Sequence, residues 1–270
     1  MTPSHDSLRG ELAALCDRLS GPQLLLLRKA AEAMTRPVAA ILDPNSDLTT
    51  PAFALAFSNQ LVLHHVVSDE PLKKKSFEYL LRNAFEAGGK SATVNPQTSS
   101  WVVTADGVQY SCKTEAESKM VRGRVRIQKF MDGTWVRECA DAAAYAAKAA
   151  EVFPTHLARY DRMLVLRVFR LPATAYLYQL VEVPLDVLGR LGSLSPAQIV
   201  RTRGTKESRA FAADVTAPGP DGQSVKAFRV LFDRSVNKVR LHGIDVSLCR
   251  LHGEWTIPLQ PEAGRSPADE

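Results

Sequence analysis

The chain has 270 residues, of which 45% are hydrophobic, and its formal net charge is +5. This length and composition allow a sizeable core in one large domain or two small ones. Residues 1–10 do not resemble a secretory signal, and no apolar run of eighteen residues follows. We therefore expect a cytoplasmic protein with no membrane partner. The modest positive charge suits nucleic acid, although many proteins without such a partner share it.

Helical patterns open the chain. Residues 7–35 carry apolar side chains at helical spacing that is broken near Gly21-Pro22, which predicts two helices joined by a short turn. Residues 36–50 contain two prolines and several polar residues, so we expect a loop there. Helical spacing then resumes over 51–66.

The next helix is expected to begin after Ser76, which can cap it, and to stop at Gly88-Gly89. Glu78 would lie in its first turn. There it could favour the positive end of the helix dipole, or it could point at a metal site on a neighbouring element. The sequence leaves both interpretations open.

A β-hairpin is predicted over residues 101–119, because the pair Asp106-Gly107 stands between runs of β-branched and aromatic residues. Pairing outward from that turn places Val102 opposite Ser111. Side chains two residues apart lie on the same face of a strand, so Lys113 projects from the same face as Ser111.

Lys113 and Glu115 end the second strand of this hairpin on the Ser111 face. A lysine and carboxylates on a hairpin, with an acid such as Glu78 from a neighbouring helix, is the arrangement of metal-dependent nucleases of the PD-(D/E)XK type. Their acids hold Mg²⁺ on the scissile phosphate, and the lysine orients or activates the attacking water. A short string of this kind taken alone favours a solvated strand end.

A basic segment follows the hairpin. Its cations are Lys119, Arg122, Arg124, Arg126 and Lys129. In an extended chain the three arginines lie on one side, next to the Lys113 face, where they could contact DNA phosphates. The alternative is a solvated basic edge strand, since cations protect sheet edges from pairing. Lys74, in a run of three lysines, is a second candidate phosphate contact.

The second half of the chain predicts a larger sheet. A helix is expected over the alanine-rich residues 139–153 and a short one over 185–191. A surface loop is expected over 204–224. Strands are expected at 163–169, 176–183, 227–232, 239–242 and 255–257.

The cysteines and histidines carry weaker signals. The four cysteines are widely spaced and contain no C-x-x-C pair, so we expect them to be reduced. Cys249 and His252 have the spacing of half a zinc site, but no second pair accompanies them. His64 and His65 are better explained by the end of a helix than by catalysis.

From about Leu61 to Trp255 the chain resembles the SmaI-type restriction endonucleases. Single pieces such as KTEA are weak, and their shared order and spacing make the resemblance specific. The segments that carry it are QLVLHHVVSDEPLKKKSFEYLLRNAF, Asn95-Pro96, CKTEAESK, RIQKFM, GTW, YDRMLVLRVFRLP, YLYQLVEVPLDVL, AFRVLFDRSVNKVRL and CRLHGEW. The last of these is then a structural segment of the family rather than half of a zinc site.

The resemblance implies an α/β (α+β) restriction-endonuclease-like fold, with a mixed central β-sheet flanked by helices. We expect residues 1–66 to form an N-terminal helical region, 67–258 to form the nuclease domain, and 259–270 to be a disordered tail.

The resemblance also implies a Mg²⁺-dependent type II endonuclease that cuts double-stranded DNA at a short palindrome, with no small-molecule cofactor. A homodimer is expected because two-fold protein symmetry matches a palindromic site. Lys113, Glu78 and Glu115 fall on matching positions. Lys113 would polarise the nucleophile, and the two glutamates would bind the metal.

The chain departs from the family pattern at two positions. Val102 stands where an essential metal-binding aspartate is expected, and Ser111 replaces a frequent acid. Neither is a good ligand for a hard cation. Asp106 cannot compensate, because strand rise puts the turn on the order of 20 Å from Lys113. A DNA-binding homologue that does not cleave is therefore the alternative, and an RNA-directed or unrelated basic protein is a third possibility.

Overall fold

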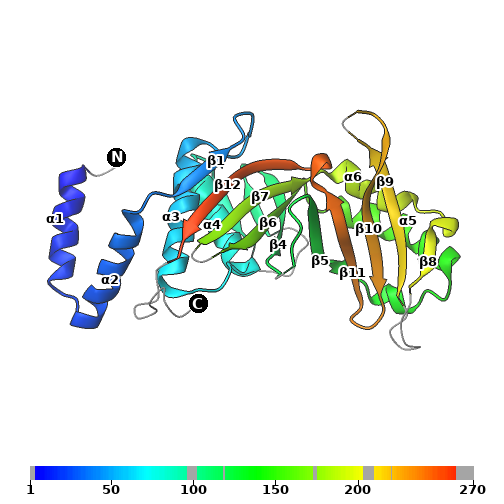
Figure 1. Ribbon diagram of the computed structural model, residues 1–270, viewed down its shortest axis with the longest axis horizontal. Coiled ribbons are helices and arrows are strands. Elements are labelled where there is room, and N and C mark those ends of the chain that lie inside the picture. Colours follow the sequence, from blue (N-terminus) through cyan, green and yellow to red (C-terminus); the bar gives the residue numbers. More distant parts are fainter. Residues whose placement is uncertain are drawn as a thin grey trace.

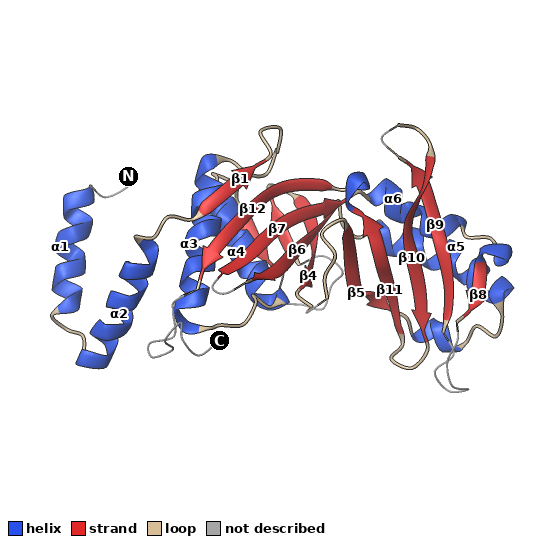
Figure 2. Ribbon diagram, in the orientation of Figure 1, coloured by secondary structure: helices blue, strands red, loops and turns tan. Residues whose placement is uncertain are grey.

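The structure is a computed structural model that describes residues 4–95, 102–117, 119–172, 175–202, 210–219 and 221–259. Two β-sheets lie side by side along its long axis, and a pair of helices extends from one end (Figure 1). Helices cover the outer side of each sheet (Figure 2). The predicted α/β architecture, with a mixed sheet flanked by helices and helices at the N-terminus, is confirmed. The expected tail lies almost wholly outside the described residues.

The first sheet has seven strands in the order β1-β12-β7-β6-β4-β3-β2. Neighbouring strands are antiparallel, except that β4 and β6 run parallel. The strands are β1 (Ala39–Leu42), β2 (Ala92–Val94), β3 (Val103–Ala105), β4 (Val108–Glu115), β6 (Arg162–Leu171), β7 (Ala175–Val183) and β12 (Arg250–Pro258).

Helices α3 (Pro51–Val67) and α4 (Lys74–Ala87) cover one face of this sheet (Figure 1). Both α4 and the strands turn apolar side chains toward each other, and Phe77, Leu81 and Phe85 of α4 are fully buried. The apolar stripe predicted for this helix is therefore its core face, as expected of an amphipathic helix on a sheet.

The second sheet is antiparallel, with the order β5-β11-β10-β9-β8, and helix α5 (Ala142–Leu157) packs against it. Met163 and Val165 of β6 belong to the same core, so α5 and the second sheet also cover the other face of the first sheet. The strands are β5 (Arg124–Asp132), β8 (Ile199–Arg201), β9 (Phe211–Pro218), β10 (Ser224–Asp233) and β11 (Lys238–Asp245). The remaining elements are helix α6 (Leu185–Gly189) and short 3₁₀ turns at Thr134–Arg137, Arg190–Ser193, Pro196–Gln198 and Val246–Leu248.

Two predicted loops contain strands. β1 lies within the expected loop 36–50, and β9 lies within the expected loop 204–224. β9 alternates buried residues such as Phe211 and Val215 with the exposed Asp214, but alanines fill much of its buried face and weaken the strand signal. Pairing with β12 and β10, respectively, makes these segments strands.

Helix α4 begins earlier than predicted. Its N-cap residue is Lys73 and its first residue is Lys74, so Ser76 lies inside the helix. The carbonyl of Lys73 accepts the first helical bond from the backbone N–H of Phe77. Glu78 is consequently in the second turn, and the first turn contains no acid. An interaction of Glu78 with the helix dipole, which is strongest in the first turn, does not explain its position.

The two predicted N-terminal helices are confirmed as α1 (His5–Cys16) and α2 (Gly21–Met34). No residue of α1 is buried, and Ala33 is the buried residue of α2. By contrast, β1 and α3 belong to the first sheet and its helical cover. Among the described residues, no helix is long and apolar enough to cross a membrane.

Candidate active site and basic surface

The Asp106-Gly107 turn sets the hairpin register. Both residues have positive φ, 48° and 82°, which a tight two-residue hairpin turn requires. Val103 pairs with Tyr110 as predicted, and the carboxylate of Asp106 accepts a 2.9 Å bond from the backbone N–H of Ser91. Asp106 is a turn former, as the sequence predicted.

Strand β4 continues beyond the part that β3 covers. The pairing of β3 stops at Tyr110, while β4 runs on beside β6 to Glu115. Tyr110 and Cys112 belong to the core under α4. By strand alternation Lys113 points to the other face, toward β5.

Lys113 occupies a confined position on that face. Its ammonium group donates a 3.1 Å hydrogen bond to the backbone carbonyl of Phe130 on β5. Burial, with the nearby charges of Lys74 and Lys129, lowers the pKa of Lys113 to about 8. No carboxylate forms an ion pair with Lys113 among the residues that the structure describes.

Glu78 lies on the α4 side. Its side chain is buried except for a small exposed part, and its carboxylate is 3.4 Å from the ammonium group of Lys74. Burial and the charge of Glu78 raise the pKa of Cys112. Lys74 acts electrostatically on Lys113 as well, so it lies within range of both predicted catalytic groups.

Glu115 has a different partner. Its carboxylate accepts a 2.8 Å bond from the guanidinium of Arg167 on β6, and both side chains are buried. Burial raises the pKa of Glu115, and the bond from Arg167 opposes that shift. The Glu115 charge therefore balances a buried arginine.

Arg167 also organises the basic segment. It has no exposed surface, and its remaining N–H groups bond to Gln179 and to three backbone carbonyls, those of Val121, Arg122 and Arg124. A buried arginine needs such complete pairing. Arg167 thus holds the start of β5 and the turn before it against the end of β4.

Lys113 and Glu115 therefore lie on the β5 face of β4 and Glu78 lies on the α4 side, and each has its own partner: a carbonyl for Lys113, Lys74 for Glu78 and Arg167 for Glu115. The described residues contain no group of three or more His, Cys, Asp or Glu side chains placed to hold a metal ion. The hydroxyl of Ser111 is buried and Val102 offers no ligand atom. As arranged, these residues do not fit Mg²⁺.

His156, on α5, is a neighbour of Lys113 that the sequence did not single out. Its ring meets Phe130 edge-on at 5.1 Å, and its Nε2 is buried with no protein hydrogen-bond partner in the described chain. Burial, and secondarily the Lys113 charge, lowers the pKa of His156 to about 4. His156 is therefore neutral at neutral pH.

Most cations of the predicted DNA surface are paired with acids. β5 is the edge strand of the second sheet, as the alternative interpretation of the segment proposed. Arg124 lies 2.8 Å from Asp245, and Arg126 lies 2.6 Å from Glu117. Lys129 pairs with Asp132 at 2.7 Å.

Lys119 and Arg122 differ from these cations. Both are exposed, and neither forms an ion pair within the described part of the chain. Arg122 lies over the ring of Phe169 at 5.9 Å. These two side chains can contact a phosphate without first breaking an ion pair with a carboxylate.

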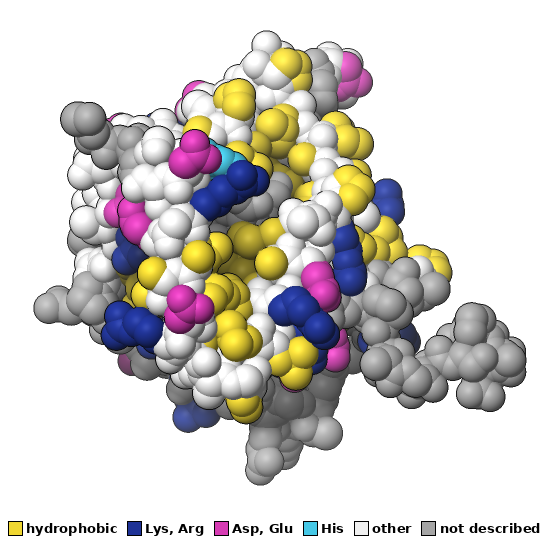
Figure 3. Space-filling model, turned by 90° about the vertical axis from the view of Figure 1, so that its left-hand side faces the viewer, with side chains coloured by type: hydrophobic (Ala, Val, Ile, Leu, Met, Phe, Trp, Pro, Cys, Tyr) yellow, Lys and Arg dark blue, Asp and Glu magenta, His cyan; other side chains and the backbone are white. Residues whose placement is uncertain are grey.

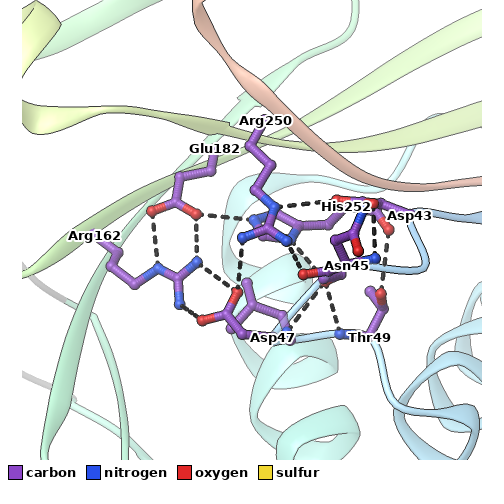
Figure 4. A network of polar contacts seen from close by, with 10 residues as sticks. Asp43, Asn45, Asp47, Thr49, Arg162, Glu182, Arg250 and His252 are labelled. Atoms are coloured by element: carbon purple, nitrogen blue, oxygen red, sulfur yellow. Dashed lines mark hydrogen bonds and ion pairs between the residues drawn. The ribbon is translucent and has the colours of Figure 1, made fainter.

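A second polar cluster joins the loop after β1 to the first sheet (Figure 4). His252 on β12 bonds to Ser46 at 2.8 Å and to Glu182 at 2.9 Å. Arg162 bridges Glu182 and Asp47. Every group has a partner of opposite charge or polarity, which marks the cluster as a structural latch.

The weaker histidine and cysteine signals have structural explanations. The Cys249 thiol contacts the backbone oxygen of Asp245, while His252 belongs to the latch, so the two do not share a site. His65 bonds to the hydroxyl of Tyr178 at 2.7 Å, and His64 bonds to a loop carbonyl. Both histidines secure the end of α3.

The latch should make the protein sensitive to acid. Burial alone would raise the pKa of Glu182, but hydrogen bonds from His252 and Arg162 lower it to about 2. The unfolded chain takes up its proton first, so this stabilisation is present above pH ~4.5 and is lost as the pH falls toward 2. Unfolding by denaturant at pH 7 and pH 3 should show a loss of about 2 kcal/mol from this carboxylate, which is still mostly ionised in the folded protein at pH 3, and Glu182→Gln should reduce that loss. Equal pH dependence in the variant and the parent would contradict this.

The family model "SmaI: Type II site-specific deoxyribonuclease" matches residues 12–257. The "Type II restriction enzyme SmaI" of Serratia marcescens is 26% identical over 227 residues, which cover 80% of this chain and 84% of that protein. No solved structure matches significantly.

Proposed function

Because this chain belongs to the SmaI family of type II site-specific deoxyribonucleases, we propose that it hydrolyses both strands of duplex DNA at a short palindrome, as a homodimer. The observation that carries the proposal is the Lys113 amine. It lies at the end of β4, beside the basic segment, with a pKa lowered to about 8. A lysine tuned to this range can exchange a proton with water near neutral pH.

In the proposed reaction, the neutral amine of Lys113 accepts a proton from water as the water oxygen bonds to phosphorus. One phosphorus–oxygen bond of the DNA backbone breaks, and the departing oxygen takes a proton from solvent. Lys119 and Arg122 hold adjacent phosphates, so the scissile group stays beside the amine. Lys74 keeps the Glu78 charge compensated and favours the neutral form of Lys113.

Mg²⁺ is the cofactor that the family implies, with Glu78 and Glu115 as its predicted ligands. Because the described carboxylates do not assemble a metal site, no step above passes through the ion. That cleavage depends on Mg²⁺ is a separate prediction. It is tested by comparing DNA cleavage in the presence of Mg²⁺ with cleavage in the presence of a chelator.

A DNA-binding protein that does not cleave is the second candidate. The observations that favour it are Val102 at the position of the expected aspartate and the engagement of Glu115 by Arg167. Such a protein would bind DNA through the basic segment but would not hydrolyse the DNA backbone.

Plasmid DNA separates the two candidates. The proposed enzyme gives discrete fragments whose ends map to one sequence. The binding protein shifts duplex DNA in a gel and leaves it intact with any divalent cation. A competition gel with RNA tests the third possibility, since an RNA-directed protein would show no preference for duplex DNA.

The basic segment gives a prediction about salt dependence. Replacing Arg122, Arg124 and Arg126 with alanine should weaken binding to every sequence and lower the slope of log affinity against log salt by up to about 3. Glu117→Gln, which releases Arg126 from its ion pair, should act in the opposite direction. Fluorescence anisotropy across a salt series measures both. An unchanged slope in the triple variant would remove the segment from the interface.

The missing acid gives a prediction about gain of activity. Val102→Asp restores the carboxylate that the family pattern expects on the first hairpin strand, where it can complete a cation site. Cleavage in Mg²⁺ should rise by about tenfold or more. Val102→Asn, which has the same shape without the charge, is the matched control and should give no gain. If the aspartate variant folds and gains nothing, another acid serves or the register differs.

A further inference from the structure

Helices α1 and α2 form an arm that leaves its own apolar side chains uncovered. Leu8, Leu12 and Leu15 recur at intervals of four and three residues, so they line one side of α1, and each is about half exposed. No residue of α1 is buried, so α2 does not cover this row. The exposed leucines of α2 are Leu24, Leu25 and Leu26.

At this end of the molecule, apolar side chains gather around a hollow (Figure 3). Monomeric proteins rarely expose a contiguous apolar area of this kind without a function. A helix of 12 residues is also marginal in water unless a neighbour packs against it. Both considerations require a partner for the arm.

We propose that this partner is the arm of a second copy of the chain, so that two α1–α2 pairs assemble into a four-helix bundle. The two helices contain 12 and 14 residues. A standard protein interface takes about 20–30 residues from each side, so the arm, of which only the facing side can contact the partner, would form a small interface. Two antiparallel helix pairs that share leucine rows are the usual source of such a bundle.

The charges fit this partner better than others. α1 carries two acids and one cation, Asp6, Glu11 and Arg9, whereas α2 carries the reverse. A two-fold axis that places α1 of one copy on α2 of the other therefore brings opposite charges together twice. Membrane surfaces and DNA would instead require a surplus of cations, which the arm lacks.

This inference rests on the proposed function in one respect: it names the element that makes the proposed homodimer. In that dimer the arm would join the copies at the far end of the first sheet from β5 (Figure 1). Dimerisation through the arm would thus leave the basic segment of each copy uncovered.

Sedimentation equilibrium of the full chain without DNA tests the arm directly. The parent should be a dimer, and both Leu12→Glu and the triple change Leu8→Ala, Leu12→Ala, Leu15→Ala should raise the dissociation constant by about 100-fold or more. Ala13→Glu is the matched control, because it adds the same charge to α1 outside the leucine row. It should leave the dimer intact.

The alanine variant keeps helix propensity, so its effect reports lost apolar contact rather than a broken helix. Thermal unfolding of the body should change little in all variants, since the arm buries almost nothing in its own copy. A monomeric parent, or a dimer that both leucine variants leave unchanged, would overturn the inference. If the leucine variants dissociate the dimer but the parent protein does not cut DNA, the inferred dimer interface would be supported and the proposed nuclease function would be contradicted.

Discussion

Replacing Lys113 with methionine should lower the rate of DNA cleavage by about 10²- to 10⁴-fold, while DNA binding and folding persist. Methionine keeps the unbranched shape of the side chain but cannot accept a proton. Because burial penalises the charged amine, its removal should leave the free energy of unfolding unchanged or raise it. The measurements are single-turnover cleavage, gel-shift affinity and denaturant unfolding.

The pH profile separates a base from a fixed charge. With the pKa of Lys113 lowered to about 8, the neutral fraction grows as the pH rises through 8, so the rate should rise and level off there. Lys113→Arg keeps a cation that cannot lose its proton, and it should be as inactive as the methionine variant. Lys148→Met, at a surface lysine paired with Glu151, is the control and should retain full activity. An active arginine variant would exclude the base role.

Arg167→Met should lower the free energy of unfolding by about 3–5 kcal/mol, the cost expected when one partner of a buried ion pair is removed. The change strands the Glu115 carboxylate and removes the guanidinium donors from the carbonyls of Val121, Arg122 and Arg124, of which Val121 keeps a bond from the backbone N–H of Arg124. Since Arg167 holds the basic segment in place, DNA affinity should fall as well. Denaturant unfolding and fluorescence anisotropy measure the two effects.

A double-variant cycle tests the pairing itself. Glu115→Gln in the Arg167→Met background removes the stranded charge, so part of the lost stability should return. Arg229→Met provides a matched arginine, because its ion pair with Asp214 is exposed and should contribute less than about 1 kcal/mol. If Arg167→Met were as mild as Arg229→Met, Glu115 would be free to serve as a ligand rather than as the partner of a buried arginine.

The sequence singled out candidate site residues one by one, but it did not predict which groups surround them. Motif spacing singled out Lys113, Glu78 and Glu115, and the turn chemistry of Asp106-Gly107 predicted the register that β3 and β4 adopt. The partners of those residues come from distant strands and from a backbone carbonyl, which local spacing does not report. The one available signal for Arg167 was a charged residue inside the apolar run MLVLRVF, where burial demands a counter-charge.

Local sequence by itself determined the elements with strong periodicity or strict turn chemistry. These include the helices α2, α3 and α5, the apolar face of α4, the β3–β4 hairpin and the long strands β6 and β7. Each of these elements depends on contacts between residues close in the chain, so the local sequence pattern is enough to predict it.

Only the tertiary structure decided the rest. β1 and β9 are strands because β12 and β10 pair with them, although their own residues favour a loop. In the same way, Lys113 depends on β5, whose Phe130 carbonyl accepts a hydrogen bond from the amine, and on the burial that lowers its pKa, while the role of Glu115 depends on Arg167 across the sheet. The physical reason is the same in each case. Strand pairing, desolvation and charge compensation depend on which distant segments come into contact, and the spacing of residues along the chain does not predict those contacts.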